Sequence, residues 1–299
     1  EFQYIWKHLN NEMPMRFIFS AFWGGQEGGF LLWMFWHNVL GLILLRKSTK
    51  WTGPAMATLS SIQVFLTSMI LGIYFGDFQF GLDPFLLLRD APQYAGLPWT
   101  TRADYLTAFP LFEDGQGLNP LLQNYWMTIH PPTLFLGFAA TSVPFAYAIA
   151  GLANREDRSW MRPALRWSFF TIGILGTGIL MGGAWAYEAL SFGGFWAWDP
   201  VENSSLVPWL TTVAGGHLLL INRNRMKPLA LFSTYYFIII SFLLVLYSTF
   251  LTKSGILGDT SVHSFVDSGI LPQLLVYLVS FLTLGHLMLL RSGVWRKRA

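Results

Sequence analysis

The sequence predicts an all-α, polytopic integral membrane protein, built as a bundle of about seven transmembrane helices. Of its 299 residues, 53% are hydrophobic and only 12% are charged, about half the charged fraction of a typical soluble domain. Seven apolar segments are long enough to cross the hydrocarbon core of a bilayer. The loops between them alternate between basic and acidic or uncharged. We therefore expect residues 1–299 to form one transmembrane domain.

The apolar segments should be helical, because a backbone in lipid must satisfy its hydrogen bonds internally. They lie near residues 28–45, 54–75, 132–152, 164–181, 203–222, 230–250 and 270–290. A tryptophan-rich loop and helices lying in the membrane interface complete the predicted fold.

The distribution of cations predicts the orientation of the bundle. Basic residues follow the first, third, fifth and seventh apolar segments, and these residues are Arg46, Lys47, Lys50, Arg155, Arg158, Arg162, Arg223, Arg225, Lys227, Arg291, Arg296, Lys297 and Arg298. The remaining segments, 76–130, 182–202 and 251–269, are acidic or nearly free of cations. The positive-inside rule places these three segments together on the outer face. Lys253 is interpreted only as an outer-face cation.

Composition also excludes several kinds of chemistry. The chain has no cysteine, which excludes disulfides, thiolate metal sites and a cysteine nucleophile. The net charge of +3 comes largely from the short basic loops, so membrane lipid is an expected partner and nucleic acid is not. The chain begins at Glu1 rather than Met, and we expect that residues of the natural protein precede it.

The outer segment 182–202 is the strongest candidate for a binding surface. This segment and the residues just after it, 185–209, are crowded with aromatic rings. These rings are Trp185, Tyr187, Phe192, Phe195, Trp196, Trp198 and Trp209. Glycine pairs at 182–183 and 193–194 would let a flat ligand approach the backbone. An aromatic belt at the lipid headgroups is the alternative, but a belt does not need paired glycines.

The same segment contains a helix start. Asp199, Pro200 and Glu202 form the pattern of a capping box, which predicts that the next helix begins at Pro200. Helix capping is therefore the alternative to a binding role for Asp199.

Two histidines on the outer face suggest haem iron. His130 follows a segment, 118–129, whose apolar residues would share one face of an interfacial helix. His263 lies in the outer loop 251–269. Two neutral imidazoles flanking an aromatic platform could supply both axial ligands of a haem. Each histidine taken alone is also compatible with a solvated loop.

Three further histidines, His37, His217 and His286, fall inside apolar spans, where an ionisable residue is a functional candidate. His217 lies 17 residues after Pro200, or about 25 Å along a helix, so it cannot serve the outer site. His217 and His286 have similar predicted depths and could face one another across a second haem. The alternative is that they are helix-packing histidines.

Four stretches resemble a known family. "WGGQEGGFLLW", "LNPLLQNYWMTIHPP", "WDPVENSSLVPWL" and "TKSGILGDTSVHSF" are similar to the CcmF family of cytochrome c maturation, within the tryptophan-rich haem-handling superfamily. The stretches occur in family order and cover nearly the whole chain. The resemblance implies a cytochrome c haem lyase subunit of the bacterial inner membrane, or of the mitochondrial inner membrane. Such a subunit receives haem from a haem chaperone and promotes its thioether attachment to the Cys-x-x-Cys-His motif of apocytochrome c.

The resemblance also implies roles for particular residues. His130 and His263 match the external haem ligands, and His217 matches the first transmembrane ligand of a b-type haem that keeps the substrate haem reduced. The haem-contacting residues would further include Trp185, Trp196, Trp198 and Asp199. The family's second transmembrane ligand is not found, so the chain is expected to be a fragment, a split subunit, or a variant in which His286 substitutes. Thiol-handling and other maturation subunits are the implied partners.

Two other functions stay open at this point. A haem transporter or export subunit would need similar walls to grip and release haem without forming bonds. A generic solute transporter would show internal repeats and broken helices at mid-membrane, and the sequence has no convincing repeat.

Overall fold

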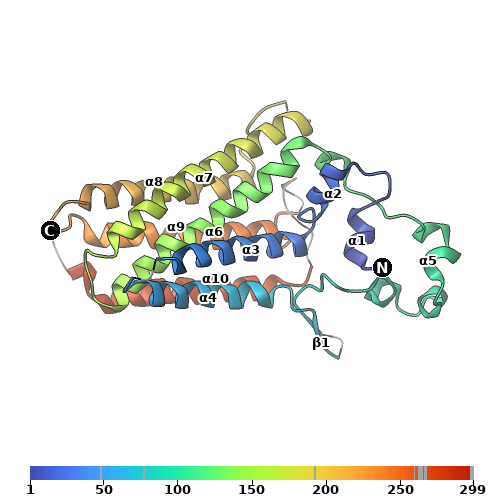
Figure 1. Cartoon of the computed structure of the whole chain (residues 1–299), viewed down its shortest axis with the longest axis horizontal. Helices are drawn as coiled ribbons and strands as arrows, with labels where there is room; N and C mark the ends of the chain where they lie inside the picture. Colours follow the sequence, from blue (N-terminus) through green and yellow to red (C-terminus); the bar gives the residue numbers. More distant parts are fainter. Residues whose placement is uncertain are drawn as a thin grey trace.

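The protein is a bundle of long helices that run side by side, as Figure 1 shows for the computed structural model. The structure describes residues 1–47, 49–76, 78–191, 193–258, 260–261, 265 and 268–296. The bundle helices are α3 (Gln26–Leu45), α4 (Thr52–Ser68), α6 (Tyr125–Ala153), α7 (Met161–Ala189), α8 (Pro200–Asn222), α9 (Leu231–Lys253) and α10 (Leu271–Ser292). Among the described residues, six of these helices, all except α4, are long and apolar enough to cross a membrane. The predicted helical membrane fold is confirmed, whereas the count of seven spans is not.

The second predicted span, 54–75, is wrong at its end. Helix α4 stops at Ser68 after 17 residues, or about 26 Å, which is shorter than the hydrocarbon core. The chain turns at Gly72, which has a φ of +56° and packs against Asp83. The apolar residues that follow form the antiparallel hairpin β1 (Ile73–Phe75) and β2 (Phe78–Phe80).

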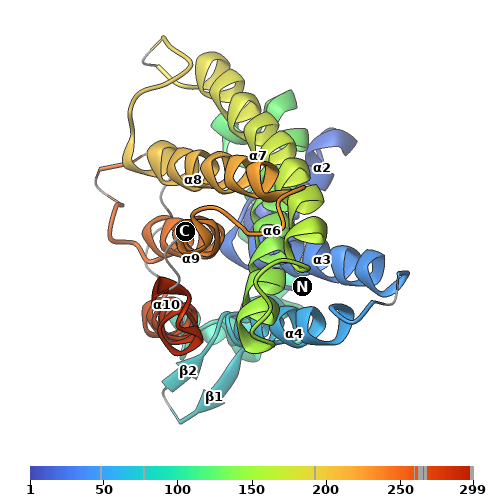
Figure 2. The same ribbon diagram turned by 90° about the vertical axis from the view of Figure 1, so that its left-hand side faces the viewer.

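Helix α6 lies at the centre of the bundle. It packs against α3, α4, α7, α9 and α10, and these helices surround it in Figure 2. Small residues allow the closest of these contacts: a Cβ at Gly137 of α6 would lie 2.7 Å from the Leu175 Cα of α7. Close backbone approach at small residues is typical of helix packing in membranes, where apolar burial alone does not drive association.

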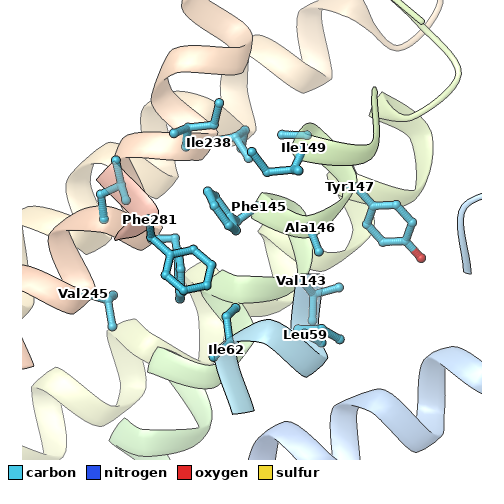
Figure 3. Close-up of a cluster of buried hydrophobic side chains, with 14 of the residues drawn as sticks. Leu59, Ile62, Val143, Phe145, Ala146, Tyr147, Ile149, Ile238, Val245 and Phe281 are labelled. Atoms are coloured by element: carbon cyan, nitrogen blue, oxygen red, sulfur yellow. The ribbon is translucent and has the colours of Figure 1, made fainter. Parts of the chain in front are cut away.

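The hydrophobic core is centred on α6, and Figure 3 shows some of its side chains where α4, α6, α9 and α10 meet. The rings of Phe145 on α6 and Phe242 on α9 have centroids 4.6 Å apart, and Phe281 of α10 completes the cluster at 6.0 Å from Phe145. These three rings are almost inaccessible to solvent. The core therefore joins helices that are far apart in the sequence.

Residues 1–24 and 69–124 form a cap on one end of the bundle, which we call the head (Figure 1). Its elements are α1 (Gln3–His8), α2 (Met15–Ala21), the β1–β2 hairpin, α5 (Tyr105–Ala108) and the short turns η1 (Leu88–Asp90), η2 (Pro92–Tyr94), η3 (Pro98–Thr101), η4 (Pro110–Phe112) and η5 (Pro120–Leu122). A small core of Trp6, Leu88, Tyr105 and Phe112 holds it together. A last short turn, η6 (Val294–Arg296), follows α10.

The opposite end of the bundle carries the basic loops. The connections from α3 to α4, from α6 to α7 and from α8 to α9 all lie there, and so does the end of α10 (Figure 1). The alternation of basic and acidic loops in the sequence thus corresponds to the two ends of the bundle.

The start of α6 differs from the prediction. No interfacial helix covers residues 118–129, because η5 ends at Leu122 and the Asn124 side chain then caps α6, accepting from the Trp126 N–H at 2.8 Å. The predicted start at residue 132 was also wrong, since α6 runs through Pro131 and Pro132. Pro131 has no N–H to donate to the Met127 carbonyl. The Trp23 indole N–H donates to that carbonyl instead, at 2.8 Å.

Candidate functional site

A cavity of about 450 Å³ opens at the head end of the bundle. Its walls come from the turn before α3, from η5, from α6 and α7, from the start of α8 and from the end of α9. The lining residues are Trp23, Gly24, Gly25, Gly29, Asn119, Leu121, Leu122, Met127, His130, Pro131, Leu134, Phe135, Phe138, Ile179, Gly182, Gly183, Trp185, Leu190, Trp196, Val201, Glu202, Ser205, Ser248, Thr249, Thr252, Lys253 and Phe265. The lining is mainly apolar and aromatic with a few polar groups, as in small-molecule and cofactor sites, and the volume falls within their usual range.

His130 lies on the α6 wall of this cavity, in the second turn of the helix. Its Nδ1 lies 2.8 Å from the Gly178 carbonyl of α7. Because a carbonyl can only accept, this bond places the ring proton on Nδ1 and makes Nε2 the nitrogen with the lone pair, as in metal-ligating histidines. A Cβ at Gly182 would lie 2.8 Å from the His130 Cε1. The glycine predicted to make room for a ligand therefore makes room for the imidazole.

Of the tryptophans predicted for the site, Trp185 and Trp196 line the cavity and Trp198 does not. Helix α7 runs to Ala189, so the predicted loop 182–202 begins only at Leu190, and Trp185 is a helical residue. Trp185 lines the cavity and donates to the Leu121 carbonyl at 3.1 Å. Trp196 also lines the cavity, and its buried indole N–H has no partner among the described residues. Trp198 does not line it: this residue is 73% exposed and packs edge-on against Trp196 at 6.3 Å.

The two acids beside these tryptophans shape the loop. Helix α8 begins at Pro200 as predicted, with the Asp199 carboxylate accepting from the Val201 N–H at 2.7 Å. The same Asp199 oxygen accepts from the Ser261 hydroxyl at 2.8 Å. The buried Glu202 carboxylate accepts from the N–H groups of Ala197 and Asp199 at 2.9 and 3.2 Å. Together these bonds fix the backbone that presents Trp196.

The cavity contains one cation that sequence reasoning did not assign to it. Lys253 is the last residue of α9, three residues beyond the predicted end of that span, and is only 3% exposed. Its ammonium lies 4.7 Å from the Phe30 ring centroid and 4.3 Å from that of Phe265. The only feature of the sequence that could have indicated this role is that Lys253 is a single lysine in an otherwise cation-free outer loop. Because it was placed in a loop, it was interpreted as solvent-exposed.

The histidines within the bundle are not brought to this cavity. His217 is exposed on α8, and its Nδ1 donates to the Val213 carbonyl of the same helix at 2.8 Å. His286 of α10 donates to the Leu282 carbonyl at 2.8 Å and packs edge-on against Tyr236 of α9. Helix α9 lies between α8 and α10 in Figure 2, so the structure does not bring His217 and His286 together.

His37 and His263 complete the set of predicted histidines. His37 is buried in α3, donates to the Trp33 carbonyl at 3.0 Å and does not line the cavity. His263 lies outside the described residues.

Comparisons with known proteins give a consistent assignment. The family model "Cytochrome C assembly protein" matches residues 23–257. The chain is 35% identical to the "Cytochrome c-type biogenesis protein CcmF" of Pseudomonas aeruginosa over 284 residues, which is 94% of this chain and 38% of that protein. The protein of the same name from Escherichia coli is 34% identical, over 94% of this chain and 39% of its own. A solved structure, "Cytochrome c Heme Lyase CcmF", superimposes with a TM-score of 0.69 and 26% identity over 93% of this chain and 38% of that one.

Proposed function

The chain belongs to the cytochrome c assembly protein family, as its motifs predict, and on this premise we propose that it is the haem-handling part of a cytochrome c haem lyase. It binds haem as a substrate in the head cavity and promotes covalent attachment of that haem to the Cys-x-x-Cys-His motif of apocytochrome c. The chain spans about two-fifths of the length of its CcmF relatives, so activity, substrate and partners are all parts of this proposal.

The observation that carries the proposal is the position of His130 in the wall of an aromatic cavity. Its lone-pair nitrogen is defined by the bond to Gly178, which suits an axial ligand of iron. Trp185 and Trp196 supply flat apolar surface in the same cavity. His263 stays the predicted opposite ligand and lies outside the described residues.

The proposed reaction asks little of the protein beyond positioning. A cysteine thiol of the apocytochrome adds across a haem vinyl group: sulfur bonds to one carbon, the proton goes to the other, and no net oxidation occurs. Both sulfurs come from the substrate, which is consistent with a chain that has no cysteine. The partners in this scheme are a haem chaperone, apocytochrome c, and thiol-handling and other maturation subunits.

For a second, b-type haem at His217, the structure supports one of the two axial ligands. The bond from Nδ1 to Val213 leaves Nε2 as the lone-pair nitrogen on an exposed helix face, which fits one axial ligand. No second imidazole stands opposite it among the described residues, because α9 separates it from His286. Electron delivery through such a haem remains a prediction.

The proposed location is the bacterial inner membrane, with the head on the periplasmic side, or alternatively the mitochondrial inner membrane. The six long apolar helices and the gathering of cations at the end opposite the head support this orientation.

Haemin titration of the purified chain tests the proposal. His130→Ala should weaken binding at least tenfold and abolish the low-spin spectrum of an iron with two nitrogen ligands, whereas His286→Ala, which lies far from the cavity, should leave that spectrum unchanged. Unaltered haemin binding by His130→Ala would contradict the site. Reconstitution with apocytochrome c then separates the two haem functions: covalent cytochrome formed equally well without this chain favours a transporter.

A further inference from the structure

The head cavity holds a buried ammonium group that the haem site described so far does not use. Lys253 is 3% exposed and its side chain reaches the cavity at the end of α9. Its Nζ has neither a hydrogen-bond partner nor an ion-pair partner among the described residues. Lys253 is also the only lysine or arginine among the described residues that line the cavity.

This ammonium lacks hydrogen-bond acceptors and a counter-ion among the described residues. The faces of Phe30 and Phe265 attract the positive charge, but rings do not satisfy three N–H donors. A buried unpaired charge is strongly unfavourable. Glu27, in the first turn of α3, acts on Lys253 electrostatically without forming an ion pair with it. An anionic occupant of the cavity would complete the site.

The surrounding backbone leaves space for the ammonium. A Cβ at Gly29 would lie 3.0 Å from the Lys253 Nζ and 3.5 Å from the Phe135 Cζ. The ammonium and the tip of the Phe135 ring therefore both lie against Gly29, and Phe135 lies five residues after His130 on α6, so both groups belong to the same cavity.

The second charged residue among the described lining, Glu202, does not compete for this role. The Glu202 carboxylate is held by two backbone N–H groups at the start of α8. Among its described lining residues, the cavity therefore has a positive group without an ion-pair partner on α9, at Lys253, and a nitrogen ligand on α6, at His130.

We propose that Lys253 binds a propionate carboxylate of haem and so fixes the orientation of the porphyrin in the cavity. This inference rests on the proposed function. With a propionate held at Lys253, the vinyl groups on the opposite edge of the porphyrin point away from this wall of the cavity. The cysteine thiols of an incoming apocytochrome would reach them from that side. Lys253 acts by positioning and takes no part in bond formation.

The test compares haemin with haemin dimethyl ester, which has no ionised carboxylates. Equilibrium titrations would be run on the wild-type chain and on Lys253→Met, Lys253→Gln and Lys253→Arg. The wild type and Lys253→Arg should prefer haemin over the ester by about 10- to 100-fold, the range expected for a hydrogen bond between charged groups. Lys253→Met and Lys253→Gln should bind both ligands equally. The ratio is measured within each variant, so a general loss of stability does not imitate the effect.

The possible outcomes separate the two claims. A wild-type chain that binds haemin and its ester equally, or neutral variants that keep the wild-type preference, would overturn the role of Lys253 while leaving the haem site intact. A wild-type chain that binds neither ligand would overturn the proposed function itself. In the haem-free protein, Lys253→Met should raise the melting temperature, because it removes an unpaired buried charge. A residue needed only for folding would lower it.

Discussion

His130 and His217 show how differently two regions of one bundle hold the same side chain. Both donate from Nδ1 to a backbone carbonyl at 2.8 Å, but His130 donates to Gly178 on a neighbouring helix and His217 to Val213 on its own. His130 is half-buried in a cavity, whereas His217 is exposed. A bond to another helix fixes the ring relative to the cavity. A bond within the helix fixes the tautomer but not the position of the ring relative to another helix. A haem site at His217 would therefore need a second ligand from outside the described residues.

The largest expected effect comes from breaking the fixed geometry of His130 without touching the histidine. Gly182→Ala adds a Cβ that would lie 2.8 Å from the imidazole and should displace the ring. Loss of geometry around a metal ligand typically lowers affinity 10- to 100-fold, and haemin titration should show a loss in that range. Gly173→Ala is the matched control, because the same helix has open space at that position. Equal affinities in the two variants would show that the α6–α7 packing does not set the site.

The second effect concerns the helix turn that carries His130. Trp23→Phe removes the indole N–H that donates to the Met127 carbonyl, and should lower the free energy of unfolding by about 1–3 kcal/mol. Chemical denaturation in detergent measures this loss.

A double variant gives the control for Trp23. Pro131→Ala restores a backbone N–H that can donate to Met127 within the helix. Trp23→Phe should then cost clearly less in the Pro131→Ala background than in the wild type. The same cost in both backgrounds would mean that the indole acts through its ring and not through its N–H.

The sequence predicted features set by local chemistry and missed those set by contacts between distant segments. The α8 start at Pro200 followed from a capping pattern within four residues. The continuation of α6 through Pro131 did not, since it depends on Trp23, more than 100 residues away. The site divides in the same way. His130, Trp185 and Trp196 were predicted from residue type and line the cavity, whereas Trp198 does not. The burial of Lys253 depends on Phe30, which lies on another helix.

A smaller effect is expected at Asp199, which, like His217, makes a hydrogen bond to the backbone of its own helix. Asp199→Ala removes the cap of α8 and should cost about 1 kcal/mol of unfolding free energy. Asp199→Asn keeps an acceptor and should cost much less. If capping is the whole role, neither variant changes haemin affinity. A loss of haemin binding in Asp199→Asn at unchanged stability would instead assign the carboxylate to the binding site.

The smallest effect is expected at His8, whose surroundings are intermediate between those of His130 and His217. His8 donates to the Tyr4 carbonyl of its own helix at 2.8 Å, as His217 does to Val213, yet it stacks on the Tyr4 ring and is half-buried beside Gly25. Burial lowers the pKa of His8 below its usual 6.5, outweighing the bond to Tyr4, which raises it; Glu27 raises it and Lys7 lowers it by lesser amounts.

The folded state therefore binds the His8 proton more weakly than the unfolded state does. The stability contribution is fully present above the unfolded pKa of about 6.5 and is lost as the pH falls through it. Thermal unfolding in detergent at about pH 7.5 and about pH 5.5 should show a small loss of stability at the lower pH. His8→Gln should reduce that loss. If His8→Gln loses as much stability as the wild type, the histidine of α1 is solvated in solution and belongs with His217 rather than with His130.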